Sequence, residues 1–228
     1  MLERVHSHDA ESRRAAFGDL TTGYWRPSYK YLRLHWRLSA EDAEDAVQSF
    51  FVTAFEKQYL EKYDASQSRF RTFLRVCLDR FVQNTKKSER AAKRGGGVAL
   101  LSLDFPDAER DIASMPAAQG DAERFFHDET VRALFGRAVD QLRHTCTSTG
   151  RDAVFAVFAQ HDLQPGATTT YATIAHALGL SVAQVTNHLH LARRLFREAA
   201  LNELRAISAT DAEYRDDARA LFGAEVDV

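Results

Sequence analysis

The sequence has little of what stabilises or anchors several classes of protein. Only two cysteines, Cys77 and Cys146, occur in 228 residues, and two are too few for a disulfide framework. Proline occurs four times, and no apolar run approaches the roughly 20 residues that a membrane-spanning helix needs. No charged-then-apolar leader opens the chain, which begins MLERVHSHDAESRR. These absences predict a cytoplasmic protein without membrane insertion.

Residue groups that carry catalysis or hold metals are also missing. There is no Cys-x-x-Cys pair, and the GGG of residues 95–97 does not follow a strand as a phosphate-binding loop would. His188 and His190 point to different faces of an expected helix, so they do not form a zinc pair. The carboxylates of EDAED are spread around one helix instead of converging. We therefore expect no catalytic residue, no metal and no cofactor, and a protein that is not an enzyme.

No alternation of apolar and polar residues is long enough to indicate a β-strand, whereas helical spacing recurs along most of the chain. The predicted fold class is therefore all-α. Helices are expected around Arg13–Leu20, from about Pro27 to Arg37, after the capping residue Ser39, and from Phe70 to Lys87. The last two carry the apolar stripes Ala43, Val47, Phe50, Phe51, Ala54, Phe55 and Phe70, Phe73, Leu74, Cys77, Leu78, Phe81.

Charge is unevenly distributed around a net value of −2. From Arg69 to Arg94 there are nine Arg or Lys and two acids, a balance of +7, whereas Val98 to Glu129 has a balance of −6. Because residues 98–120 also show little periodicity, they are expected to be extended or disordered. The predicted organisation is a helical domain over 1–97, an acidic flexible linker over 98–124, a second helical domain over 125–205, and a tail over 206–228 with a short helix near Glu213–Phe222.

The stretch YATIAHALGLSVAQVTNHLHLARRLFRE, residues 171–198, predicts a helix-turn-helix. Gly179 suits the end of one helix, and Ser181 with Gln184 forms a capping box for the next. The second helix has an apolar stripe of Val182, Val185, Leu189, Ala192 and Phe196. Its candidate DNA-binding residues are Thr186, Asn187, His190, Arg193, Arg194 and Arg197, which are types that contact bases or phosphates. The alternative is a helical hairpin with a solvated outer face.

Two further polar faces lie in the first domain. The helix after Phe70 carries basic residues interleaved with amides, a composition that fits single-stranded or distorted nucleic acid better than a merely solubilising face. Its candidate residues are Arg71, Thr72, Arg75, Arg80, Gln83, Asn84, Lys86 and Lys87. The helix after Ser39 has an acidic face with Asp42, Glu44, Asp45 and Gln48. Helix-start chemistry and docking on a basic partner explain this acidic face equally well.

These segments occur in the order found in a known family. DAEDAVQSFFVTAFEK, then FRTFLRVCLDRFVQNTKKSERAAKRGGG, then YATIAHALGLSVAQVTNHLHLARRLFRE together resemble bacterial RNA polymerase sigma factors of the extracytoplasmic-function (ECF) group. The likeness covers about Tyr24 to Leu204, and the long linker and the tail look like a subgroup with extended linkers.

The resemblance implies a transcription initiation factor whose partners are core RNA polymerase and promoter DNA, with an anti-sigma factor or other regulator as a further partner. Residues 1–97 would correspond to sigma region 2, and 125–205 to sigma region 4. The acidic face of Asp42, Glu44, Asp45 and Gln48 would dock on polymerase. The Arg71–Lys87 face would capture the opened minus-10 element and an extruded base, and the helix from Ser181 would read the minus-35 element. The acidic linker would mimic nucleic acid on the polymerase.

One departure from the family pattern concerns the upstream reader. Thr186, Asn187, His188 and Leu191 stand where basic residues are common in the family, and fewer cations mean fewer phosphate contacts. Rival functions are a dimeric repressor or activator, a sigma-like adaptor that binds polymerase without opening promoters, and, least favoured, an enzyme acting on DNA. Promoter-directed initiation is the function that the sequence favours.

Overall fold

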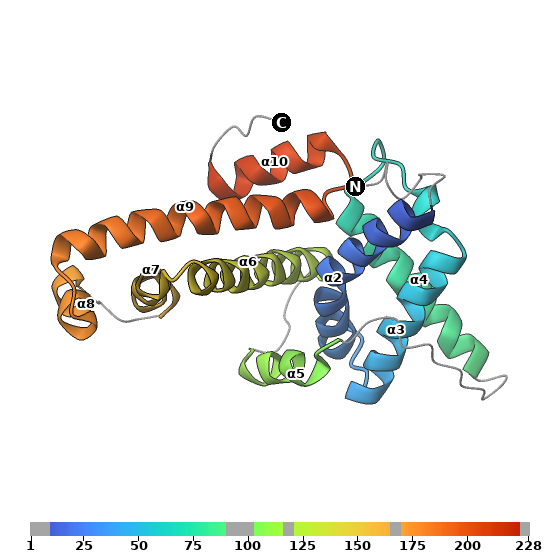
Figure 1. Cartoon of the computed structure of the whole chain (residues 1–228). Coiled ribbons are helices and arrows are strands. Elements are labelled where there is room, and N and C mark those ends of the chain that lie inside the picture. Colours follow the sequence, from blue (N-terminus) through green and yellow to red (C-terminus); the bar gives the residue numbers. More distant parts are fainter. Residues whose placement is uncertain (1–9, 90–102, 116–120, 165–169, 224–228) are drawn as a thin grey trace. The chain divides into compact units, whose positions relative to one another are not determined.

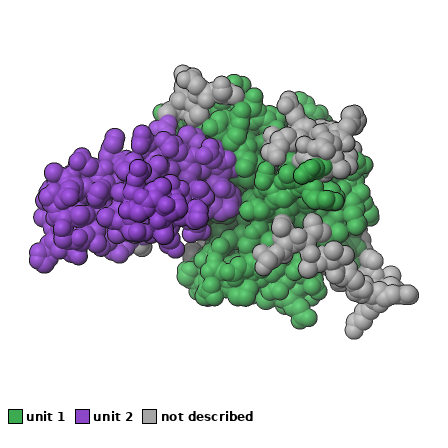
Figure 2. Space-filling model, viewed as in Figure 1, with its two compact units in different colours: residues 1–133, 204–228 green, residues 134–203 purple. Residues whose placement is uncertain are grey.

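The structure is a computed structural model that describes residues 10–89, 103–115, 121–164 and 170–223. Every regular element in these ranges is a helix (Figure 1), so the all-α prediction is confirmed. By contacts the chain forms two compact units, residues 1–133 with 204–228 (unit 1) and residues 134–203 (unit 2), which Figure 2 colours separately. In this division the acidic linker and the C-terminal tail belong to unit 1.

Unit 1 begins with α2 (Ala10–Leu34), one long helix with Pro27 inside it. The expectation of two separate helices here was wrong. Proline removes one backbone hydrogen bond, but buried aromatic residues on both sides of Pro27, including Tyr24, Tyr29 and Tyr31, hold the helix across it. Tertiary packing thus decides the continuity of this helix.

Helix α3 (Ala40–Glu56) starts as expected, because the Ser39 hydroxyl accepts a hydrogen bond from the Asp42 backbone N–H at 3.1 Å. The apolar stripe of α3 is buried except for Phe55, which is partly exposed.

Helix α4 (Phe70–Glu89) follows the short helix η1 (Tyr59–Lys62) and buries Phe70, Leu74 and Leu78. The other expected core residues of this helix, Phe73, Cys77 and Phe81, are only half-buried, because they line a cavity.

The linker contains a helix, α5 (Phe105–Ser114), which begins at the capping residue Asp104. The expectation of an extended or disordered segment was therefore wrong for these residues, whereas 98–102 and 116–120 lie outside the described residues. The Phe105 ring packs against the rings of Trp25 and Tyr29 on α2, with centroids 5.3 and 5.0 Å apart. The acids of α5 pair with the cations of α2, namely Arg26 with Asp107 at 2.5 Å and Arg33 with Glu109 at 2.6 Å.

The remaining helices are α6 (Ala122–Ser148), α7 (Asp152–Phe158), the π-helical turn η2 (Ala159–Leu163), α8 (Tyr171–Leu178), α9 (Val182–Ile207) and α10 (Asp211–Phe222). The short terminal helix expected near Glu213–Phe222 is α10. Unit 2 has its own core, in which α6, α7, α8 and α9 contribute Leu142, Val157, Ile174 and Leu189 among others. This core fixes the orientation of α9.

Candidate nucleic-acid interface

The turn between α8 and α9 has the geometry that the sequence predicted. Gly179 has a φ of 66°, and the Leu180 backbone N–H donates to the Ala175 carbonyl at 2.9 Å. The Ser181 hydroxyl accepts from the Gln184 N–H at 3.2 Å, and the Gln184 side-chain oxygen accepts from the Ser181 N–H at 2.8 Å. These reciprocal bonds form the expected capping box, so α8 and α9 are joined by a tight turn.

One face of α9 is buried and the opposite face is open. Val185, Leu189 and Ala192 are buried in the core of unit 2. Val182, which was expected in this stripe, is 49% exposed, because it is the first residue of α9 and lies ahead of the packed turns. The exposed residues on the other face are Thr186, Asn187, His190, Arg194 and Arg197. These side chains are of the types that contact bases or phosphates in a DNA groove.

Arg193 differs from its neighbours in α9. Its guanidinium donates to both oxygens of Asp162 at the end of α7 and η2, at 2.9 and 2.8 Å. The hydrogen bond from Arg193, assisted by one from His161, holds the pKa of Asp162 below its usual range. Leu191 is half-buried and packs against the core of unit 2. Arg193 and Leu191 are thus held by unit 2 itself.

The N-terminal half of the α4 basic face is engaged by acids of unit 1. Arg71 pairs with Asp217 of α10 at 2.7 Å, and Arg75 pairs with Glu123 of α6 at 2.9 Å. The Thr72 hydroxyl donates to Glu123 as well. Sequence reasoning treated this half as an open cationic surface, and the structure places carboxylates on it.

The C-terminal half of the same face is open. Arg80, Gln83 and Asn84 are exposed, whereas the side chains of Lys86 and Lys87 lie outside the described residues. A cavity of about 790 Å³ lies beside Arg80 and Asn84, between α4, the end of α3, and η1 with the turn that follows it. Its lining includes the aromatic rings of Tyr59, Phe73 and Phe81, the cations Lys57, Lys62 and Arg80, and the amides Gln67 and Asn84.

Sequence reasoning missed the part of this cavity that comes from outside α4. Lys57, Tyr59 and Lys62 belong to the KQYLEK stretch between α3 and α4, in which one aromatic residue lies between two lysines. A lone tyrosine between two cations is a weak signal, and the cavity becomes visible only in the fold. Cys77 also lines the cavity, and burial raises the pKa of its thiol, although Arg80 and Lys62 oppose this rise. The thiol is therefore a neutral part of the wall.

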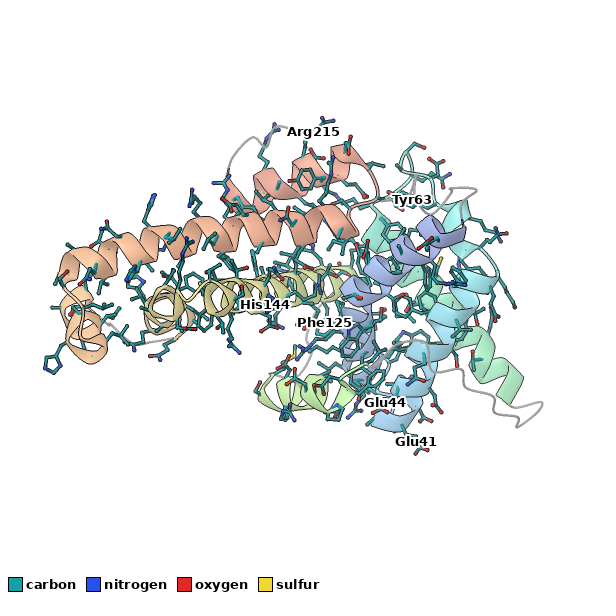
Figure 3. The ribbon with its side chains drawn as sticks, viewed as in Figure 1. Glu41, Glu44, Tyr63, Phe125, His144 and Arg215 are labelled. Atoms are coloured by element: carbon teal, nitrogen blue, oxygen red, sulfur yellow. The ribbon has the colours of Figure 1, made fainter. Side chains whose placement is uncertain are left out.

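The acidic face of α3 is accessible at its N-terminal end. Asp42 and Asp45 are exposed, and Glu44 and Gln48 are half-buried. Glu41 and Glu44 are labelled at the same end of α3 in Figure 3. Asp42 also accepts a hydrogen bond from the Ser39 hydroxyl at 2.7 Å, so it takes part in the helix start. Asp45 has no such capping role among the described residues, so it is the clearest candidate for contact with a partner.

Among the described residues, none of the helices combines the length and the apolar character of a membrane span. No group of three or more His, Cys, Asp or Glu in the same ranges could hold a metal ion.

The chain matches the sequence profile of the family described as "ECF sigma factor" over residues 1–202. A search of curated proteins and a search of solved structures each gave no match. The family resemblance inferred from the three motifs is thereby confirmed, since the profile spans most of the chain. The chain belongs to the ECF sigma factor family, whose members act with core RNA polymerase at promoter DNA to initiate transcription.

Proposed function

We propose that this chain docks on core RNA polymerase, directs it to specific promoters and opens the minus-10 element. The observation that carries the proposal is the cavity beside α4. Its aromatic rings can stack on an exposed base, its amides can bond the base edge, and its three cations can hold the flanking phosphates. Cations together with aromatic rings are the combination that single-strand-binding sites commonly use, whereas a duplex would hide its bases from such a cavity.

The two units have different roles in this proposal. Unit 2 presents Asn187, His190 and Arg194 on the exposed face of α9 to the major groove of the minus-35 element, since Asn suits adenine and Arg suits guanine or phosphate. Unit 1 grips the opened strand through the cavity and through the Arg71–Asn84 face of α4. The acidic face of α3, with Asp45 at its centre, binds a basic surface of polymerase.

Arg80→Ala tests the opening step. Arg80 is exposed, lines the cavity and supplies one of its three cations. We expect the variant to bind core polymerase as the wild type does but to form fewer open complexes, measured by the fluorescence of 2-aminopurine placed in the minus-10 element. Arg110→Ala is the control, because it removes the same charge from α5, where the side chain is 71% exposed. Wild-type opening by Arg80→Ala would contradict the proposed role of the cavity.

An adaptor that binds polymerase without opening promoters is the second candidate. The pairing of Arg71 and Arg75 with internal acids favours it, because paired cations contribute less to phosphate binding. The same experiment separates the two functions, since an adaptor would form a stable complex with polymerase and no open promoter at all.

A further inference from the structure

Helix α10 lies on the beginning of α4, and its acids are directed at that region. Glu213 accepts hydrogen bonds from the Phe70 backbone N–H at 2.6 Å and from the Tyr63 hydroxyl at 2.9 Å. A carboxylate at this position accepts from an otherwise unpaired N–H in the first turn of α4. Its negative charge is also stabilised by the positive end of the α4 helix dipole. Tyr63 is labelled beside α10 in Figure 3.

Asp217 makes the second part of this contact. It accepts from Arg69 and from Arg71, the latter at 2.7 Å, and the Arg71 and Asp217 side chains are each only 17% exposed. Asp216 lies 3.7 Å from Arg69. Two adjacent acids of α10, Asp216 and Asp217, therefore face the cations Arg69 and Arg71 where α4 begins.

The geometry of these pairs resembles binding of a nucleic-acid backbone. A guanidinium binds a carboxylate and a phosphate through the same N–H donors. The acids of α10 thus occupy the donors that a DNA strand running along α4 toward the cavity would use. Arg71 cannot direct the same N–H groups to Asp217 and to a phosphate at the same time.

The contact is suited to reversible release. Most of its ion pairs are partly exposed to solvent, and such pairs contribute little stability. Only Tyr214 and Ala218 of α10 are buried, so the apolar anchor is small. Helix α10 also lies beyond residue 202, where the match to the family profile ends, so the contact belongs to a segment that the profile does not cover.

We propose that α10 is an intramolecular competitor for DNA, which covers Arg69 and Arg71 at the start of α4 and leaves them when the opened strand binds. This inference rests on the proposed function of α4. In the closed state the free protein grips single strands weakly, and displacement of α10 exposes Arg69 and Arg71 to join Arg80 in holding the strand.

Asp217→Asn in the full chain tests the competition. It keeps the shape of the side chain and removes the charge that faces Arg69 and Arg71. Asp211→Asn is the matched control, because it removes the same charge from α10, but Asp211 pairs with Arg205 at 2.9 Å instead of with α4. The probe is a fluorescein-labelled thymidine oligomer of about 12 nucleotides, within the usual site size for single strands.

We expect Asp217→Asn to bind this oligomer about tenfold more tightly than the wild type, because the closed state is depopulated, and Asp211→Asn to change little. In the wild type, hydrogen exchange should show that the α10 amides lose protection when the oligomer binds, while those of α3 do not. Equal affinities for the two variants, absence of binding by Asp217→Asn, or unchanged α10 protection would each overturn the inference.

A third variant separates this inference from the proposed function. Arg80→Ala should weaken oligomer binding whatever α10 does, because the cavity is open in both states. If Arg80→Ala weakens binding while Asp217→Asn behaves as the control does, α10 is only a structural helix and the cavity keeps its role. If Asp217→Asn tightens binding while Arg80→Ala has no effect, the strand is held at the start of α4 and the cavity assignment fails.

Discussion

The two candidate DNA surfaces differ in how much of their charge is available. On α9 in unit 2, Asn187, His190 and Arg194 are exposed, and among the described residues their side chains have no acid paired with them as Arg193 has. On α4 in unit 1, Arg71 and Arg75 are paired with acids from α10 and α6. If both surfaces bind DNA, the one in unit 2 breaks no internal ion pair at these three side chains, whereas the one in unit 1 must first exchange the partners of Arg71 and Arg75.

The difference shows that a segment's net charge does not give its accessible charge. The +7 balance of residues 69–94 and the −6 balance of residues 98–129 are real, but a large share of them cancels inside unit 1. Glu123 on Arg75 and Asp111 on Lys30 are examples. The positive electrostatic field that remains at the surface of unit 1 comes from exposed side chains such as Arg80.

The largest effect should come from the core that orients α9. Leu189 is 2% exposed in the core of unit 2, so Leu189→Ala should lower the free energy of unfolding of unit 2 by about 2–5 kcal/mol. Val182→Ala on the same helix should cost far less, since Val182 is 49% exposed. Chemical denaturation followed by circular dichroism measures both variants. Equal losses for the two would mean that α9 is not held by this stripe.

The next effect concerns the open face of α9. Arg194→Ala should reduce binding to the upstream promoter element by about 1–3 kcal/mol if the side chain pairs with guanine. Asn187→Ala should change sequence preference more than affinity. Arg193→Ala is the control, because Arg193 is held by Asp162 and its loss should affect DNA little. Holoenzyme binding to a promoter pool with a randomised upstream element measures all three, and wild-type behaviour of both Asn187→Ala and Arg194→Ala would remove α9 from the DNA interface.

A several-fold loss of affinity for core polymerase is expected for Asp45→Arg. Asp45 is exposed on α3 away from the buried stripe, so the variant should keep its fold while reversing the charge of a contact. Asp140→Arg places the same charge reversal on an exposed position of α6 in unit 2 and should bind polymerase normally. A titration of labelled core polymerase with each variant measures the affinities. If Asp45→Arg binds with the affinity of the wild type, the docking surface on α3 is refuted.

The smallest predicted effect is the loss of stability at acid pH, which should be larger in unit 1 than in unit 2. Hydrogen bonds from Arg110 and Arg26 lower the pKa of Asp107, and hydrogen bonds from Arg33 and Tyr29 lower that of Glu109. Because these folded-state values lie below the ordinary values of 3.8 and 4.5, the stabilisation is present above those values and is lost as the pH falls through the folded ones.

Tryptophan emission can follow this response in unit 1 alone. The two tryptophans of the chain, Trp25 and Trp36, lie in unit 1, and Trp25 packs against Phe105 of α5. Emission should shift to the red as the pH falls below about 4, the range of the unperturbed carboxyl pKa values, when α5 loosens from α2. An emission that stays constant down to pH 3 would show that the acid pairs of α5 contribute nothing to its docking.

Local signals in the sequence were sufficient for the turn between α8 and α9 in unit 2. The capping box at Ser181 and the glycine turn at Gly179 each depend on a few adjacent residues, so spacing alone predicts them. The exposed face of α9 followed from the same periodicity. Arg193 was missed as an internal partner because Asp162 is distant in sequence and only the folding of α7 and η2 brings it near.

Contacts between distant segments explain what sequence reasoning missed in unit 1. The helix at Phe105–Ser114 is stabilised by ion pairs with Arg26, Lys30 and Arg33 of α2. Its capping residue Asp104 and the proline in its first turn were local signals of a helix start that the composition of the segment obscured. The continuity of α2 through Pro27 likewise depends on aromatic packing. Composition revealed that α4 is basic, but it contained no indication that acids of α10 cover its first turn.

The most direct test is transcription in vitro by purified core polymerase over a pool of genomic promoter fragments, with and without the full chain. The chain should produce transcripts from a small set of promoters that share an upstream and a minus-10 element, with strand opening at the latter. Stable binding to polymerase without promoter-specific transcripts from any fragment would contradict the assignment of promoter opening.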